Sequence, residues 1–166
     1  MIILSLGSNL PSTFGDKFYN LKYAMSLLEE SGIAIDKKSS FYETPSYPDN
    51  ANPKFVNIVI TVITNLSPIK LMQRCLNIEK ELGRKRNKKN EPRTCDIDIV
   101  DYDQKAIKMN KSFNLNIPHP EMHKRNFVLL PLFEIAKSWI HPVKKKGIKK
   151  LLNSLNSKDL RTIKLI

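Results

Sequence analysis

The sequence predicts an α+β fold, a ferredoxin-like βαββαβ sandwich with a C-terminal hairpin and short helices. Three observations support this prediction. Two segments repeat apolar residues at steps of three and four, as amphipathic helices do, and four other segments are strand-like. These segments follow one another in the order βαββαβ. Because no third βα unit extends the series, the order favours a sandwich of the ferredoxin-like kind.

The first half of the chain contains one helix and three strands. Residues 2–6 are an apolar run that predicts a buried strand, and a Gly-Ser-Asn-Leu-Pro-Ser turn follows. The next helix ends near Gly32, since glycine commonly caps a helix C-terminus. Its apolar stripe consists of Phe14, Phe18, Leu21, Met25 and Leu28. Residues 33–43 are strand-like, residues 44–53 hold three prolines and predict a long exposed loop, and residues 55–64 predict another strand.

The second half begins with another amphipathic helix. Ser67 is a suitable N-cap, Pro68 suits the first helical position, and Gly83 marks the end. Its apolar stripe consists of Leu71, Cys75, Ile78 and Leu82. Residues 84–93 are polar and lack periodicity, which predicts a mobile loop, and residues 94–102 predict a strand. The remainder, from residue 106, predicts a hairpin, a Pro-His-Pro turn, and two short helices near residues 127–136 and 147–155.

Length and composition indicate one domain over residues 1–166. A chain of 166 residues with 41% hydrophobic content can bury one core of ordinary size. No apolar run reaches the roughly 20 residues that a membrane span needs, and the apolar start has no basic flank. We therefore expect a cytoplasmic protein that does not bind membranes. Its cysteines, Cys75 and Cys95, are expected to be free thiols.

The formal net charge of +12 indicates attraction to polyanions, which include nucleic acid, anionic membrane and polyphosphate substrates. Charge alone does not choose among them. The C-terminal lysines are expected to be solvated surface residues. They are Lys144, Lys145, Lys146, Lys149 and Lys150. The cationic residues between 84 and 93 differ, because two aspartates follow them directly.

These aspartates form the chemically informative pair of the sequence. On a strand, alternation places Asp96 and Asp98 on one face and turns Ile97 and Ile99 toward the core. Carboxylates at positions about 6.6 Å apart repel by roughly 2.5 kcal/mol at an effective dielectric constant near 20. One explanation is a solvent-facing acidic pair satisfied by arginines. The other is a Mg²⁺ site facing a polyphosphate, which the adjoining cationic loop favours.

A magnesium site of this kind needs no histidine or cysteine. Mg²⁺ binds one or two carboxylates and completes its octahedron with water and phosphate oxygens. Arginines then supply forked contacts to the phosphates. The sequence contains neither Gly-x-x-x-x-Gly-Lys-Ser/Thr nor Gly-x-Gly-x-x-Gly, so a glycine loop of the nucleoside-triphosphatase or kinase type is excluded.

Six short blocks follow one another between residues 6 and 133. They are Leu-Gly-Ser-Asn-Leu at 6–10, Ser-Phe-Tyr-Glu-Thr-Pro at 40–45, Phe-Val-Asn at 55–57, Glu79 with Gly-Arg-x-Arg at 83–86, Pro-Arg-Thr-x-Asp-x-Asp at 92–98, and Pro-His-Pro-x-Met with Arg-x-Phe at 118–127. In this order and spacing, the blocks resemble the 6-hydroxymethyl-7,8-dihydropterin pyrophosphokinase family. The resemblance implies transfer of the β,γ-pyrophosphoryl group of ATP to the hydroxymethyl group of a reduced pterin, with release of AMP, in folate biosynthesis.

The resemblance also implies roles on the nucleotide side. Asp96 and Asp98 correspond to the ligands of two Mg²⁺ ions. Together with Arg84 and Arg93, which steady the triphosphate, they form the implied catalytic centre. Nucleotide contacts are implied for Glu79, Arg84, Arg86, Arg93, Ile99, His119 and Arg125.

On the pterin side, the resemblance implies two aromatic rings, an amide and a closing loop. Flat heterocycles stack well between rings, and an in-plane amide donates and accepts hydrogen bonds at once. The rings are Phe55 and Phe127, the amide is Asn57, and the loop residues are Thr44, Pro45 and Tyr47.

Simpler interpretations exist for several of these residues. Without the resemblance, Phe55 and Phe127 would be assigned to the core. His119 between two prolines suits a rigid turn as well as a binding role, and His123 and His141 are expected at the surface. A polar residue in the middle of an apolar strand needs a ligand or a backbone partner, which is the situation of the amide at position 57.

The loop before the aspartates departs from the family pattern. That pattern usually has a further arginine and a tryptophan there, whereas this chain has Asn-Lys-Lys-Asn-Glu at 87–91, one residue shorter, and its tryptophan is Trp139. We expect residues 85–91 to be mobile without ligands and ordered when nucleotide and pterin are both bound, because the segment has no apolar residue to bury.

Two other functions compete with the pyrophosphokinase. A ferredoxin-like sheet with a net charge of +12 also suits an RNA-recognition domain, but the aromatic signature strand of that class is absent from the sequence. A metal-dependent phosphotransferase with another acceptor is the third possibility. The expected partners are ATP and a reduced pterin rather than nucleic acid or membrane, and linkage to other folate-pathway enzymes stays open.

Overall fold

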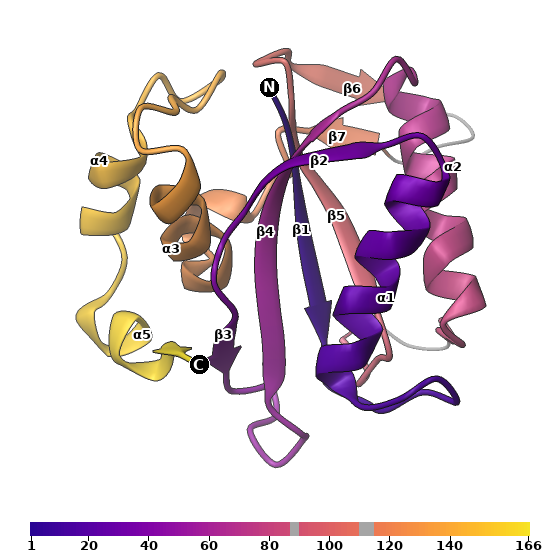
Figure 1. The fold of residues 1–166 in the computed structure, drawn as a ribbon. Helices are drawn as coiled ribbons and strands as arrows, with labels where there is room; N and C mark the ends of the chain where they lie inside the picture. The colour runs from indigo at the N-terminus through magenta and orange to yellow at the C-terminus, as the bar shows by residue number, and fades with distance from the viewer. Residues whose placement is uncertain (87–89, 110–114) are drawn as a thin grey trace.

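A computed structural model describes residues 1–86, 90–109 and 115–166 of the chain (Figure 1). Its strands are β1 (Ile2–Ser8), β2 (Ala34–Lys38), β3 (Tyr42–Thr44), β4 (Phe55–Ile63), β5 (Asp96–Tyr102), β6 (Ile107–Met109), β7 (Leu115–Ile117) and β8 (Lys164–Leu165). Its helices are α1 (Lys17–Glu30), α2 (Pro68–Glu81), α3 (Asn126–Ile135), α4 (Ile148–Asn153) and α5 (Ser157–Thr162), with one 3-10 turn at Met122–Lys124. The predicted mobile segment 85–91 includes residues 87–89, which lie outside the described residues.

The large sheet is antiparallel and has the order β5-β1-β4-β3-β8, with β2 also paired to β4. Strand β1 lies between β4 and β5, so that Leu4 faces Ile60 on one side and Ile99 on the other. All seven residues of β1 are buried. A continuous apolar run suits this position, because both faces of the strand are covered.

Helices cover the sheet on both faces (Figure 1). α1 and α2 pack on one face, over a core that includes Leu6, Leu21 and Leu71. The other face carries α3 and α4 over a second core, to which the sheet contributes Ile3 and Val59. The prediction of an α+β fold with two sheet-backed amphipathic helices is therefore confirmed at this level.

Both long helices end as the sequence predicts. The side chain of Ser67 accepts a hydrogen bond from the backbone N–H of Lys70, and Pro68 occupies the first helical position. Gly32 and Gly83 have positive φ angles of 76° and 80°, which side chains with a Cβ rarely adopt. Glycine at these two positions lets the chain turn back toward the sheet.

The predicted strand 33–43 is in fact two strands. Lys38 is opposite Ile60, whereas Tyr42 is opposite Asn57, so four residues of this segment pass three residues of β4. Ser39 accommodates the extra residue, because its hydroxyl accepts a hydrogen bond from the backbone N–H of Val59 at 3.1 Å. A side-chain hydrogen bond here replaces part of the regular ladder.

The C-terminal third contains predicted and unpredicted elements. β6 and β7 form the expected hairpin, with Ile107 opposite Ile117, and the residues 110–114 between them lie outside the described residues. Helices α3 and α4 lie where two short helices are expected. Helix α5 and strand β8 are not predicted, because the segment is short and α5 buries no residue.

One predicted surface residue is buried. His141 is only 4% exposed, and its Nδ1 accepts hydrogen bonds from the backbone N–H groups of Val143 and Lys144, both at 3.2 Å. The expectation that it lies at the surface is therefore wrong. The lysine-rich sequence around His141 suggests an exposed position. The buried Trp139, two residues earlier, donates its indole N–H to Asp101 at 2.8 Å and keeps this part of the chain close to the core.

Within the described ranges, none of the helices combines the length and the apolar character needed to cross a membrane.

Candidate active site

The candidate site lies at one end of the large sheet, where β1 ends and β4 and β5 begin. Gly7 on β1 is opposite Asn57 on β4 and Asp96 on β5. The sheet register therefore places the predicted pterin residues and the predicted acidic pair at the same end. Two of the predicted regions, far apart in sequence, meet because β1 runs antiparallel to both neighbours.

The acidic pair lies as strand alternation predicts. Ile97 and Ile99 are each 7% exposed in the core, and the carboxylates are on the opposite face. Asp96 forms ion pairs with Arg84 and with Arg93, whose Nη2 is 2.7 Å from Asp96 Oδ2. Asp98 accepts a hydrogen bond from Arg125 Nη1 at 3.0 Å. Cations thus surround both carboxylates.

The two carboxylates differ in their electrostatics. Burial opposes ionisation of Asp96, but Arg93 and Arg84 outweigh it and lower the pKa of this carboxyl group. For Asp98, burial and the neighbouring charge of Asp96 raise the pKa above its usual value, although Arg125 opposes them. Asp98 is therefore the carboxylate that gains most from an added cation.

Glu79 is buried beneath the site and binds two of its arginines. It is 2% exposed, and its Oε1 accepts hydrogen bonds from Arg84 Nη1 and from the backbone N–H of Ile97, both at 2.7 Å. Arg86 pairs with the other oxygen. Burial raises the pKa of Glu79, while Arg84 opposes the shift. Because protein donors occupy both oxygens, Glu79 fixes the two arginines rather than facing the cavity.

Asn9 is a site residue that sequence reasoning named only within a motif block. Its Oδ1 accepts a hydrogen bond from the backbone N–H of Arg93 at 2.7 Å, and its Nδ2 donates to Pro53 O at 2.9 Å. The residue is 2% exposed. It therefore ties together the two loops that flank the site, and a polar residue directly after a buried strand is the signal that points to it.

Two arginines connect the acidic pair to the aromatic rings. The guanidinium carbon of Arg93, which pairs with Asp96, lies 4.8 Å from the centre of the Phe55 ring. That of Arg125, which binds Asp98, lies 5.6 Å from the centre of the Phe127 ring. Both distances suit cation–π contact. Both rings are only partly buried, and Phe127 also packs against the second core.

The predicted amide is held by the predicted loop. Asn57 is 4% exposed, and its Nδ2 donates to Thr44 Oγ1 at 3.0 Å and to Tyr42 O at 3.4 Å. Pro45 is partly buried next to this contact. Tyr47, in contrast, is 82% exposed and stands away from the protein surface.

His119 lies beside the acidic pair. Its Nδ1 accepts a hydrogen bond from the backbone N–H of Glu121 at 3.2 Å, and its Nε2 is 3.9 Å from Asp98 Oδ2. Burial lowers the pKa of His119, although Asp98 opposes the shift. A neutral imidazole that accepts at Nδ1 carries its proton on Nε2, so the donor faces the acidic pair.

Five basic side chains and three carboxylates line a cavity of about 250 Å³ at this end of the sheet. The lining residues are Arg84, Lys85, Arg86, Asn90, Glu91, Arg93, Asp96, Asp98, His119 and Arg125. The sequence-predicted nucleotide residues gather here, except that the Ile99 side chain is buried in the core and Glu79 lies beneath the arginines.

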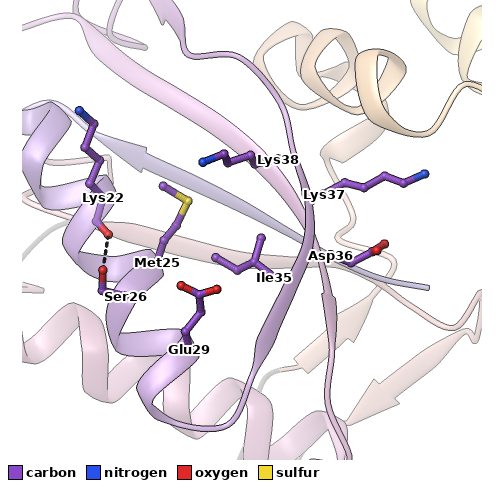
Figure 2. A pocket seen from close by; sticks show the side chains of 8 residues that line it. All are labelled: Lys22, Met25, Ser26, Glu29, Ile35, Asp36, Lys37 and Lys38. Carbon is purple, nitrogen blue, oxygen red and sulfur yellow. Dashed lines mark hydrogen bonds between the residues drawn. The ribbon is translucent and has the colours of Figure 1, made fainter.

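A larger cavity of about 390 Å³ lies elsewhere, between α1 and β2. Figure 2 shows its charged side chains spread along the groove, with Asp36 and Lys37 pointing away from α1. Asp36 accepts a hydrogen bond from the Thr61 hydroxyl at 3.0 Å. None of the predicted site residues lines this cavity, so it is not the candidate active site.

Carboxylates held among arginines beside a basic cavity are groups of the kind that phosphoryl transfer uses. Residues 3–137 match the family described as 7,8-dihydro-6-hydroxymethylpterin-pyrophosphokinase (HPPK). The chain belongs to this family.

Individual relatives agree with the family assignment. The chain is 36% identical to a 2-amino-4-hydroxy-6-hydroxymethyldihydropteridine pyrophosphokinase of Aquifex aeolicus, over 89% of this chain and 88% of that protein. It is 38% identical to the Bacillus subtilis protein of the same name, over 81% of this chain and 77% of that protein. These names indicate pyrophosphokinase activity in folate synthesis for the family to which the chain belongs.

Some relatives are much longer. The folic acid synthesis protein fol1 of Schizosaccharomyces pombe is 36% identical over 95% of this chain, which spans 21% of that protein. The crystal structure of wild-type HPPK-DHPS from Plasmodium falciparum has a TM-score of 0.68 at 18% identity, over 92% of this chain and 44% of that one. The likeness to this structure concerns the fold alone.

Proposed function

We propose that the chain transfers the β,γ-pyrophosphoryl group of ATP to 6-hydroxymethyl-7,8-dihydropterin. The hydroxymethyl oxygen attacks the β-phosphorus and loses its proton. The bond from that phosphorus to the oxygen bridging the α-phosphate breaks, and AMP leaves with the electron pair. The observation that supports this reaction best is the chain of contacts from each carboxylate through an arginine to an aromatic ring, at Arg93 and Arg125.

The donor set suits two Mg²⁺ ions. Among residues 1–86, 90–109 and 115–166, no group of three or more histidine, cysteine, aspartate and glutamate side chains is arranged to hold a metal ion. Asp96 and Asp98 would therefore share the ions with water and phosphate oxygens, as Mg²⁺ permits. When bound, the ions neutralise phosphate charge and polarise the attacking hydroxyl group.

The arginines hold the triphosphate. Arg84 and Arg93 are already directed at the acidic pair, and Arg93 Nε is buried with no hydrogen-bond partner among the described residues. A phosphate oxygen would satisfy this donor. His119 offers its Nε2 proton, Arg125 and Arg86 add positive charge, and Glu79 positions Arg84 and Arg86. The backbone beside Ile99 is proposed to contact the adenine.

The other end of the site binds the reduced pterin. Phe55 and Phe127 stack on the heterocycle, and Asn57 binds its edge. The loop that contains Thr44, Pro45 and Tyr47 closes over it. The exposed ring of Tyr47 is free to move inward, since it is 82% exposed.

The same proposal covers the setting of the reaction. The order β5-β1-β4-β2, with α1 and α2 on one face, supports a ferredoxin-like description of the frame. We propose that residues 1–166 form one domain, that the protein acts in the cytoplasm on ATP and pterin rather than on nucleic acid or membrane, and that it works alone or linked to other folate-pathway enzymes, as the name of the bifunctional Arabidopsis thaliana relative suggests.

One incubation tests the proposed function. The protein is mixed with ATP, Mg²⁺ and 6-hydroxymethyl-7,8-dihydropterin, and the nucleotide products are separated. We expect AMP and pyrophosphorylated pterin in equal amounts, and no AMP when the pterin or Mg²⁺ is omitted. Release of ADP or of free pyrophosphate instead would assign the site to a different phosphotransferase.

A further inference from the structure

Residues 156–166, which contain α5 and β8, contact both walls of the proposed pterin site, although none of them is a predicted site residue. In Figure 1 this segment, drawn in yellow, lies beside β3 at the edge of the sheet and below α3. The match to the family covers residues 3–137, so the segment also lies outside that match. We name residues 156–166 the C-terminal strap.

The first contact is with α3. Asn126 is the first residue of α3, is 8% exposed, and stands between Arg125 and Phe127. Its Nδ2 donates to Asp159 O at 2.5 Å and to Thr162 Oγ1 at 3.3 Å. The Thr162 hydroxyl in turn donates to Asp159 O at 2.7 Å. These bonds fix the start of α3, next to the predicted pterin ring of Phe127 and to Arg125, which binds Asp98.

The second contact is with β3. Leu165 is opposite Tyr42, Lys164 is opposite Glu43, and the backbone N–H of Ile166 donates to Phe41 O at 3.1 Å. β3 ends at Thr44, whose hydroxyl receives a hydrogen bond from Asn57. The strap therefore covers the outer edge of the short strand that holds the pterin-binding amide in place.

The strap contributes little to the hydrophobic core. No residue of α5 is buried, both residues of β8 are exposed, and Leu160 is only partly buried against the α3 side of the core. Its contacts are instead hydrogen bonds to two separate elements. A segment with this pattern therefore acts more through the position of those two elements than through burial of apolar surface.

We propose that the C-terminal strap and Asn126 position the two walls of the pterin site relative to each other, and that they affect the affinity for the pterin more than the affinity for ATP. Asn126 is a positioning residue, because it does not touch a substrate. It joins α3 to the strap, and the strap in turn pairs with β3. This inference rests on the proposed function for the ligand, while the positioning itself is measurable without any ligand.

Two substitutions with matched controls test the proposal. Asn126→Ala removes the bonds to α5, and Lys158→Ala changes an exposed side chain of the same helix. Ile166→Pro removes the backbone donor to Phe41, and Ile166→Ala keeps it. We expect Asn126→Ala and Ile166→Pro each to weaken binding of 6-hydroxymethyl-7,8-dihydropterin about threefold to tenfold, as loss of one or two hydrogen bonds predicts. MgATP affinity should change less than about twofold in every variant.

Hydrogen exchange of the ligand-free protein tests the positioning of the two walls separately from pterin binding. Amides of residues 42–46 and 125–128 should exchange faster in Asn126→Ala and Ile166→Pro than in the wild type and both controls. Unchanged exchange together with unchanged pterin affinity would overturn the strap proposal, as would equal losses of pterin and MgATP affinity. Faster exchange in a protein that binds no pterin at all would support the strap and reject the proposed function.

Discussion

At the scale of single residues, the hydrogen bonds of Asn57 fix the orientation of its side-chain amide. Tyr42 O can only accept a hydrogen bond, so the Asn57 nitrogen must face it, and the second amide hydrogen points to Thr44. In the proposed function, the carbonyl oxygen Oδ1 would therefore be the atom of Asn57 that accepts a hydrogen bond from the pterin, because both amide hydrogens are already used within the protein.

Gly7 makes room for that oxygen. A Cβ at this position would lie 3.1 Å from Asn57 Oδ1 and 3.7 Å from Phe55 Cδ1. Asn57 has little freedom to retreat, because two hydrogen bonds hold its nitrogen. We expect Gly7→Ala to weaken pterin affinity roughly tenfold by calorimetric titration and to leave MgATP affinity unchanged. Gly147→Ala is the control, because a Cβ there meets nothing within 4 Å. Equal pterin affinities of the two variants would contradict the assignment of Asn57.

Asp98 carries the second prediction. Burial and Asp96 raise the pKa of Asp98, so ionisation of this carboxyl group is less favourable in the ligand-free folded protein than in the unfolded chain. Asp98→Asn removes this repulsion and one proposed metal ligand. We expect thermal stability to be kept or increased, while AMP formation falls by more than about a hundredfold.

Asp103→Asn is the matched control for this substitution. Asp103 has a φ angle of 51°, which asparagine also adopts, and it lies in the turn after β5. The control should keep full turnover. Near-normal turnover of Asp98→Asn at saturating Mg²⁺ would remove Asp98 from the metal site.

Local pattern was enough to find some site residues and not others. Alternation on a strand predicts that Asp96 and Asp98 share a face, because the two residues belong to one element. The link from Asn9 to Arg93 joins residues 84 positions apart. No periodicity carries such a contact, and the same holds for the placement of Arg93 over Phe55.

At the scale of elements, α3 is fixed at both ends. Asn126 holds its start, and Glu134 near its end accepts hydrogen bonds from the Ser40 backbone N–H at 3.0 Å and from the Tyr42 hydroxyl at 3.0 Å. Burial, followed by this hydrogen bond, raises the pKa of Tyr42 to about 12, so the phenol stays a donor even at the pH where an ordinary tyrosine ionises. Glu134 thereby connects α3 to the break between β2 and β3.

Glu134→Ala tests this connection. The variant leaves the Ser40 N–H and the Tyr42 hydroxyl to water, so we expect the free energy of unfolding to fall by about 1–2 kcal/mol in urea titrations. Glu121→Ala is the control, since Glu121 forms a surface ion pair with Lys124 at 3.1 Å, and such pairs contribute little. Similar losses of unfolding free energy in both variants would show that the contact of Glu134 with Ser40 and Tyr42 stabilises the protein no more than a surface ion pair does.

The elements that the sequence predicts best are those with internal periodicity. α1 and α2 have apolar stripes over several turns and clear caps, and β1 is a continuous apolar run. The division of residues 33–43 into β2 and β3 depends on Ser39 bonding to Val59 on another strand. α5 and β8 are too short to show a period, and β8 exists only because β3 offers an edge.

At the scale of the whole molecule, the sheet separates two cores and leaves one end free. The cores fix β1, β4 and β5 from both faces, so the ends of these strands hold the site residues in a constant register. The functional end needs few apolar contacts of its own. Trp139, which is 2% exposed, belongs to the second core, and the lysine-rich segment after it follows the buried His141.

His141 links the stability of the molecule to pH. Burial, with further contributions from His123 and Lys144, lowers the pKa of His141 to about 4, from 6.5. Protonation at Nδ1 would also break the hydrogen bonds from Val143 and Lys144. The unfolded chain takes up this proton near pH 6.5. The contribution of His141 to the free energy of unfolding therefore decreases as pH falls below 6.5 and levels off below about 4, by a total on the order of 3 kcal/mol.

The variant His141→Asn isolates the contribution of His141 to the pH dependence of stability. An asparagine oxygen still accepts backbone hydrogen bonds but does not titrate, so the difference in unfolding free energy between wild type and variant should be largest near pH 7 and shrink steadily toward pH 4. Urea titrations at a series of pH values measure this difference, and an NMR titration of the His141 ring measures its pKa directly. Titrating groups that do not interact with His141 contribute equally to both proteins and cancel. A constant difference across this range, or a ring that titrates near 6.5, would show that burial of His141 does not control the acid stability of the protein.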